Sequence, residues 1–210
     1  METSPILDNK DADAPSIFAP AALLREARRQ KGMTAGNVPS LCILDPDGDI
    51  VRRLNASGEA KRSDVWPCYH TELHEFALAG ARAGIVGCAV GAPFAVLVAE
   101  ELFACGCRTL ISLTSAGQID PISPPPYFVV IDRALRDEGT SYHYAAPAVF
   151  AEADPALVII ARDALTGQDL HAHVGASWTT DAPFRETEQA VAAARAKGVL
   201  AVEMESSEER

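Results

Sequence analysis

The chain has 210 residues, of which 48% are hydrophobic, so it is long enough to bury the core of one domain with a short appendage. Its formal net charge of −11 argues against nucleic acid as a partner, because non-specific binding to nucleic acid depends on Lys and Arg. The first residues lack the basic start and apolar run of a signal peptide, and the uncharged stretch 83–99 is broken by glycines and Pro93. We therefore expect a soluble globular protein with no membrane partner.

Residues 1–38 are predicted to form a flexible arm followed by one helix. The arm, 1–19, is rich in Asp, Ala, Ser and Pro, a composition that buries little apolar surface. Segment 19–32 favours a helix, because Pro20 stands near its start and Gly32 at its end. Residues 39–210 then form the predicted main domain.

Short apolar runs alternate with amphipathic segments through the main domain, which predicts an α/β protein. We expect a three-layer α/β/α arrangement with a mixed central sheet, in which the strands at 85–90, 108–114, 171–178 and 199–205 are neighbours. The strands are predicted at 40–44, 85–90, 108–114, 127–135, 171–179 and 199–205, and the helices at 70–84, 94–106, 154–165 and 184–198.

Polar clusters follow several of these strands, at the positions where open α/β sheets bind ligands. The clusters are "TSAGQ" (114–118), "RDEGTSYHY" (136–144), "SWTTDAPFRET" (177–187) and "EMES" (203–206). Four such clusters in one domain are difficult to explain as ordinary surface. They therefore predict a binding site at one edge of the sheet.

The last three clusters, in this order, resemble motifs of the nucleoside phosphorylase superfamily, which includes uridine and purine phosphorylases and nucleosidases. The resemblance covers residues 40–206 and implies a phosphorylase/hydrolase-like fold. It also implies a cytoplasmic glycosyltransferase of nucleotide salvage, which cleaves a nucleoside with phosphate as co-substrate and works as a homo-oligomer without a cofactor. The five cysteines, an odd number set mostly among Ala, Val and Leu, agree with reduced thiols in such a compartment.

The resemblance implies that Met204 and Glu205 bind the ribose and that Glu203 braces the site. A carboxylate near the sugar fits the chemistry, because the transition state of ribosidic cleavage resembles an oxocarbenium ion. Taken alone, the tripeptide is equally compatible with a strand end that carries two solvated glutamates.

The 177–187 cluster is expected beside the base. Trp178 and Phe184 offer an apolar or stacking wall, Thr180 lies between them, and Arg185 can hydrogen-bond a carbonyl and stabilise charge on the leaving base. An alternative is that Thr180 or Asp181 caps the following helix. Uridine-cleaving relatives pair this arginine with a glutamine that has no counterpart here, so the identity of the base stays open.

The remaining candidates come from the other loops. His143 is expected near the pocket, with a catalytic base as the less favoured role, and Arg136 and Asp137 are expected to form an ion pair. His171 and His173 share one face of a strand and are a weak candidate metal pair; we expect no metal. The resemblance assigns Ser115 and Gly117 to a phosphate-binding turn.

The phosphate site departs from the family pattern at its three arginines. Gly48, Ser112 and His74 stand where the family has these cations, and Asp47 and Asp49 oppose an anion. Three alternatives follow: a phosphorylase with relocated cations, a nucleosidase that uses water, and a non-catalytic nucleoside-binding paralogue. Candidate replacement cations are Arg52, Arg53 and Arg108.

Two further expectations concern competing classes and the end of the chain. A dinucleotide-binding protein is disfavoured, because "GCAVGA" is not followed by an acidic residue about twenty positions later. The family continues past its E-M-E-S motif into a helix, a strand and a closing helix, whereas only four residues follow Ser206 here. The resemblance therefore predicts a truncated domain whose strand 199–205 is uncovered on one face.

Overall fold

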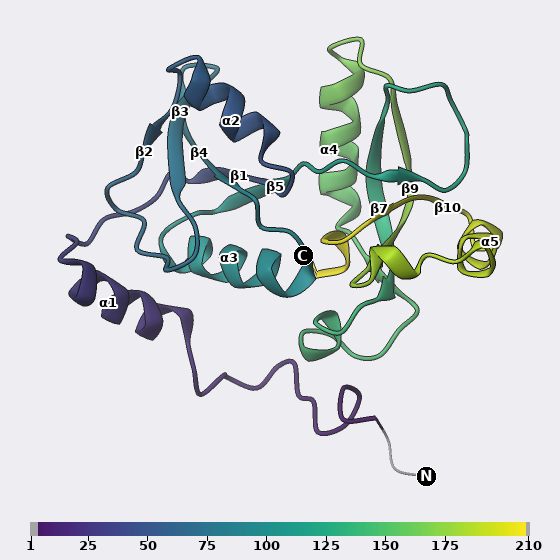
Figure 1. Ribbon diagram of the computed structural model, residues 1–210, viewed down its shortest axis with the longest axis horizontal. Helices are drawn as coiled ribbons and strands as arrows, with labels where there is room; N and C mark the ends of the chain where they lie inside the picture. Colours follow the sequence, from purple (N-terminus) through teal and green to yellow (C-terminus); the bar gives the residue numbers. More distant parts are fainter. Residues whose placement is uncertain (1–3, 209–210) are drawn as a thin grey trace. The chain divides into compact units, whose positions relative to one another are not determined.

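The structure, a computed structural model, describes residues 4–208 of the chain (Figure 1). The described residues form two compact units, each built on its own five-stranded sheet. One unit comprises residues 14–114, and the other comprises the described residues before 14 and after 114. No helix within residues 4–208 combines the length and the apolar composition that a membrane crossing needs.

The unit 14–114 has helices on both faces of a mixed sheet with strand order β2-β3-β4-β1-β5. Cys42 and Leu44 face the core beneath α1 and α3, whereas Ile43 faces α2, as alternation along a strand requires. The result is a three-layer α/β/α arrangement. The elements are α1 (Pro20–Lys31), β1 (Leu41–Asp45), α2 (Asp49–Ala56), β2 (Lys61–Arg62), β3 (Leu73–Leu78), β4 (Ala81–Gly87), α3 (Ala92–Ala104) and β5 (Thr109–Ser112).

Segment 70–84, which the sequence pattern assigned to a helix, is instead a hairpin. Strands β3 and β4 pair antiparallel along their whole length, and Ala79 and Gly80 turn the chain with φ of 49° and 80°. Phe76 packs against the α2 side of the sheet, so pairing with the apolar strand β4 outweighs the helix propensity of Ala and Leu. Helix α2, which the sequence analysis did not predict, buries Val51 and Leu54 three residues apart.

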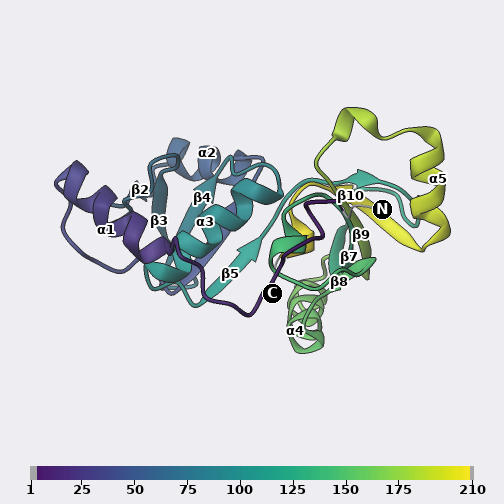
Figure 2. The ribbon, with the colours of Figure 1, turned by 90° about the horizontal axis from the view of Figure 1, so that it is seen from below.

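The second unit carries a mixed sheet with strand order β6-β10-β9-β7-β8, in which β7, β9 and β10 are parallel. Helices α4 and α5 lie on opposite sides of this sheet (Figures 1 and 2). The predicted cap of α4 is confirmed, since the Asp154 carboxylate accepts a hydrogen bond from the Ala156 N–H. The elements are β6 (Gly117–Gln118), β7 (Phe128–Asp137), η1 (Ser141–His143), β8 (Phe150–Glu152), α4 (Pro155–Thr166), β9 (Ala172–Thr180), η2 (Pro183–Arg185), α5 (Glu188–Ala196), β10 (Val199–Glu203) and η3 (Ser206–Glu208).

Two expectations about the strands were wrong. The four strands predicted to be neighbours are divided between the two sheets, with β1 between β4 and β5, and with β9 beside β10. Strand β10 is not uncovered: it lies between β6 and β9, and all of its residues except Leu200 are buried. Leu200 is only partly exposed, because it packs so closely over Gly175 that a Cβ there would lie 2.4 Å from Leu200 Cδ1.

A buried carboxyl group lies in the core of the first unit. Glu101, on α3, is 2% exposed, and its Oε2 atom has no hydrogen-bond partner. Burial raises the pKa of the Glu101 carboxyl, although a hydrogen bond from Cys68 and the nearby charges of His70 and Lys31 act in the opposite direction. The folded state therefore favours the protonated carboxyl.

We expect Glu101→Gln to raise the free energy of unfolding at pH 7 by about 1–2 kcal/mol, because glutamine keeps the shape of the side chain and removes the charge that burial disfavours. When folding raises the pKa of a carboxyl group, the folded protein becomes less stable as the pH rises above the pKa of that group in the unfolded chain, about 4.3. The gain should therefore vanish near pH 3, where the carboxyl is protonated in both states. Urea unfolding at the two pH values measures the difference, with the exposed Glu59→Gln as control; an equal gain at both would contradict the account.

Candidate functional site

The sheet register of the second unit brings the predicted polar clusters to one edge. Arg136 of β7 pairs with Thr179 of β9, and Thr179 pairs with Glu203 of β10, so three parallel strands end at the same level. Gly117 of β6 pairs antiparallel with Val202, so the residues just before β6 lie near the end of β10. The clusters at 114–118, 136–144, 177–187 and 203–206 therefore converge, as the sequence predicted.

Glu203 holds the turn that follows β10. It is 5% exposed, and its Oε1 atom accepts a hydrogen bond from the Thr179 hydroxyl at 2.7 Å. Its Oε2 atom accepts from the backbone N–H groups of Glu205 and Ser206 at 2.7 and 2.6 Å. One carboxylate thus joins β9, β10 and η3, and it fixes the backbone that carries Met204 and Glu205.

The turn directs Glu205 inward. Glu205 is 2% exposed, and its Oε2 atom accepts a hydrogen bond from the Met204 N–H at 3.3 Å. Met204 is partly buried. The alternative of a strand end with two solvated glutamates is therefore wrong, because both Glu203 and Glu205 are removed from water. Burying two carboxylates this close together costs free energy, so such a pair is expected only where the structure or the function needs it.

Trp178 and Thr180 lie on the other face of β9 from Thr179. The Trp178 indole is 4% exposed and packs in the core beneath α5, and its Nε1 atom donates to Asp137 Oδ2 at 3.0 Å. Thr180 is buried, and its hydroxyl accepts from the Ala182 N–H. The structure therefore gives Trp178 a packing role, and its contact with a base stays a prediction.

Phe184 and Arg185 stand on the short turn η2, where both side chains are exposed, Phe184 to 99%. The predicted helix 184–198 starts later, at Glu188, and its cap is Thr187, whose hydroxyl accepts from the Ala190 N–H. Capping by Thr180 or Asp181 is therefore wrong. Asp181 instead accepts a hydrogen bond from the Gly139 N–H at 3.0 Å, which ties the η2 loop to the loop after β7.

His143 is exposed at the end of η1, and Ser115 is exposed before β6. Position 117 needs glycine because the backbone there lies close to the Val202 side chain: a Cβ atom at this position would be 2.8 Å from Val202 Cγ1. Glycine lets β6 pair tightly with β10, which brings the chain at Ser115 near the E-M-E turn. The binding roles of Ser115, Gly117 and His143 stay predictions.

The network around Arg136 was not predicted from the sequence. No ion pair joins Arg136 to Asp137, because consecutive strand residues point to opposite faces. Arg136 Nε instead donates to the Ser141 hydroxyl at 2.6 Å, and Glu138 accepts from the Ser141 N–H at 2.9 Å and from its hydroxyl. The period-two alternation of the strand would have separated Arg136 from Asp137 in advance.

The turn 44–49, in which Gly48 stands where the family has one of its phosphate-site arginines, lies in the first unit. Asp45 is 1% exposed and accepts hydrogen bonds from the N–H groups of Gly48 and Val51. Arg52 donates to the Asp47 carbonyl and to the Asp49 carboxylate, and this pair is largely exposed. The Gly48 and Val51 N–H groups and the Arg52 guanidinium are therefore already engaged by groups of the turn.

The histidine pair forms a separate aromatic cluster. The rings of His171 and His173 are 4.8 Å apart, Tyr127 packs against both, and His173 Nε2 lies 2.9 Å from the Ser123 hydroxyl. Within residues 4–208, no group of three or more His, Cys, Asp or Glu side chains has the geometry of a metal site.

Together, the fold and the site define an α/β protein. Its polar loops gather at the carboxyl ends of the parallel strands β7, β9 and β10 of a mixed sheet. The chain belongs to the Phosphorylase superfamily, whose sequence model matches residues 40–209. Both the family and the α/β phosphorylase fold expected from the sequence motifs are confirmed.

Individual relatives agree with this assignment. Uridine phosphorylase from Thermococcus kodakarensis is 27% identical over 145 residues, which is 64% of this chain and 52% of that protein. A crystal structure of uridine phosphorylase from Vibrio fischeri ES114 superimposes with a TM-score of 0.70 at 26% identity, and covers 81% of this chain and 71% of its own. A second structure of that enzyme, complexed with 6-hydroxy-1-naphthoic acid, has a TM-score of 0.72 at 24% identity and supports the fold alone, over 85% of this chain and 76% of its own. This chain spans about half the length of the Thermococcus relative.

Proposed function

We propose that the protein cleaves the N-ribosidic bond of a nucleoside with phosphate, giving ribose 1-phosphate and the free base. A phosphate oxygen forms the bond to C1′ as the bond from C1′ to the base nitrogen breaks, and that electron pair leaves with the base. Membership of the Phosphorylase superfamily and similarity to uridine phosphorylases support this class of reaction.

The observation that carries the proposal is the buried E-M-E turn. Positive charge develops on the sugar as the C–N bond breaks, and a carboxylate already fixed in a water-poor site stabilises that charge without reorganising. Glu205 is the proposed catalytic carboxylate, and Met204 contacts the ribose. Glu203 is held by the Thr179 hydroxyl and by two backbone N–H groups, so its own role is to position the turn.

The base is assigned to the η2 loop. Phe184 is almost completely exposed and is free to stack on a heterocycle, and Arg185 beside it can donate to a carbonyl oxygen and stabilise charge on the leaving base. We propose Thr180, His143, Ser115 and Gly117 as neighbours of the bound substrate. Uridine is the first candidate substrate, since uridine phosphorylases are the named relatives.

A nucleosidase that uses water is the second candidate, and the Asp45–Asp49 turn favours it. Arg52, one of the candidate replacements for the missing arginines, is already paired with Asp49 at 2.5 Å. Phosphate must therefore compete with a carboxylate of this chain for that cation.

We expect phosphate to bind with a dissociation constant on the order of 1 mM or weaker. A nucleoside-binding paralogue without turnover is the third alternative.

A nucleoside panel tests these alternatives. Uridine, thymidine, inosine and adenosine are incubated with the protein in phosphate or in chloride of equal ionic strength, and the free base is measured by chromatography. We expect base release that requires phosphate and half-saturates at millimolar phosphate. Equal release in both buffers would assign a nucleosidase, and binding of a nucleoside without release would assign the non-catalytic alternative.

The same proposal fixes the expected partners. They are a small-molecule nucleoside and inorganic phosphate, with no cofactor, no metal, no nucleic acid and no membrane. We further propose a cytoplasmic homo-oligomer that serves nucleotide salvage. Gel filtration with light scattering tests the oligomeric state.

A further inference from the structure

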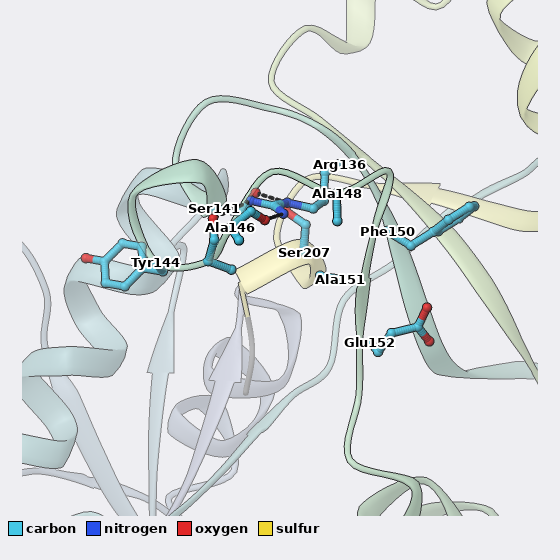
Figure 3. A pocket seen from close by; sticks show the side chains of 10 residues that line it. Arg136, Ser141, Tyr144, Ala146, Ala148, Phe150, Ala151, Glu152 and Ser207 are labelled. Carbon is cyan, nitrogen blue, oxygen red and sulfur yellow. Dashed lines mark hydrogen bonds between the residues drawn. The ribbon is translucent and has the colours of Figure 1, made fainter. Parts of the chain in front are cut away.

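A cavity of about 340 Å³ lies in the second unit, and it is lined by residues of the 136–144 cluster and by Ser207 but by no residue of the 177–187 loop. Its walls come from the end of β7, from the loop 141–148, from β8 and from η3 (Figure 3). Half of the lining residues are apolar, and four of these are alanines. The apolar lining residues are Ala145, Ala146, Ala148, Phe150 and Ala151.

Two buried polar groups face this cavity with unused hydrogen-bonding capacity. Ser207 is 3% exposed, and its hydroxyl has no hydrogen-bond partner among the described residues. Arg136 is 6% exposed and uses three of the five N–H groups of a guanidinium, toward Ser141, Ala146 and Ala145. In Figure 3 the Ser207 side chain points toward the guanidinium group of Arg136.

The charges around Arg136 favour an acceptor with partial negative charge. No Asp or Glu side chain among the described residues lies within ion-pair distance of Arg136. Its opposite charge, Glu138, acts through the shared hydroxyl of Ser141. Glu152 lines the cavity but is exposed to solvent, where its charge is screened. A buried, incompletely satisfied cation and an unpartnered hydroxyl both require an acceptor.

We propose that this cavity binds a small aliphatic carboxylate. One carboxylate oxygen accepts from Arg136 and the other accepts from the Ser207 hydroxyl, because a guanidinium N–H and a neighbouring O–H match the two oxygens of one carboxylate. A short alkyl chain then fills the space between the alanines and Phe150. Because Ser206 is hydrogen-bonded to Glu203, a ligand on Ser207 lies directly beside the turn that carries Glu205.

Sodium butyrate is the probe, compared with sodium chloride at equal ionic strength. We expect butyrate to raise Tm saturably, with a dissociation constant on the order of 1 mM, and to show saturation transfer from the protein in NMR. Ser207→Ala should weaken binding about tenfold, since one hydrogen bond to a charged group is lost. This variant removes an unpartnered hydroxyl, so it should not destabilise the free protein.

Matched variants separate this site from a general salt effect. Ser177→Ala removes another buried and unpartnered hydroxyl that does not line the cavity, so butyrate binding should be unchanged. Ala151→Leu should fill the cavity and abolish binding. The proposal is overturned if butyrate acts like chloride, if Ser207→Ala binds as the unmodified chain does, or if inorganic phosphate binds in a Ser207-dependent way more tightly than butyrate.

Discussion

Glu205→Gln is expected to lower kcat/KM for nucleoside cleavage by about 10²–10³-fold, the loss typical of removing one fixed electrostatic contact with a transition state. Glutamine keeps the shape and the acceptor oxygen that faces the Met204 N–H, but it removes the negative charge. The loss should appear in kcat more than in KM, because the sugar becomes cationic only in the transition state. Steady-state kinetics with uridine and phosphate measures it.

The fold should tolerate this change, so the loss of activity can be separated from a loss of structure. Glu205 is buried beside Glu203, and removing one of two neighbouring buried charges relieves repulsion. We expect an unchanged or higher Tm. An unaltered kcat/KM would remove Glu205 from the mechanism, and a lower Tm with proportionate loss of activity would make it a structural residue.

Glu203→Ala is expected to lower the free energy of unfolding by about 3 kcal/mol. The Glu203 carboxylate satisfies the Thr179 hydroxyl and two backbone N–H groups, and alanine leaves all three without that acceptor in a buried place. Urea unfolding measures the change. Activity should fall as well, since the backbone of Met204 and Glu205 is no longer fixed.

Thr179→Val provides the graded comparison, because it removes only one of the three hydrogen bonds and keeps the shape of the side chain. We expect a loss of about 1 kcal/mol. Glu188→Gln, an exposed glutamate on the first turn of α5, is the control and should change stability by less than about 0.5 kcal/mol. If Glu203→Ala behaved like this control, the carboxylate would not be the support of the turn.

The gathering of the polar loops could be predicted from sequence because it follows from a simple rule. Strands that run parallel end at the same edge, and the residues after β7, β9 and β10 are polar whatever the details of the packing. The hairpin at 70–84 could not be predicted in this way. Its Ala, Leu and Glu residues favour a helix, and only pairing with β4 makes the strand form.

The site residues, too, could be predicted from the sequence only in part. The motifs pointed to Glu203, Met204 and Glu205, but they carried no information that both carboxylates are buried. Trp178 was expected to form a wall for the base; the structure places its side chain on the core face of β9, and its contact with a base stays a prediction. Side-chain direction depends on the register of three strands, and a bulge shifts that register between Val199 and Ala201.

Measuring the transfer of the ribosyl group to phosphate tests the central proposal most directly. Uridine and inorganic phosphate are incubated with the protein, and ³¹P NMR follows the phosphorus signal while chromatography measures uracil. We predict a ribose 1-phosphate signal that grows in step with uracil, one for one, and is strongly reduced with Glu205→Gln. Uracil released without any sugar phosphate, or no uracil at all, would contradict phosphorolysis by this chain.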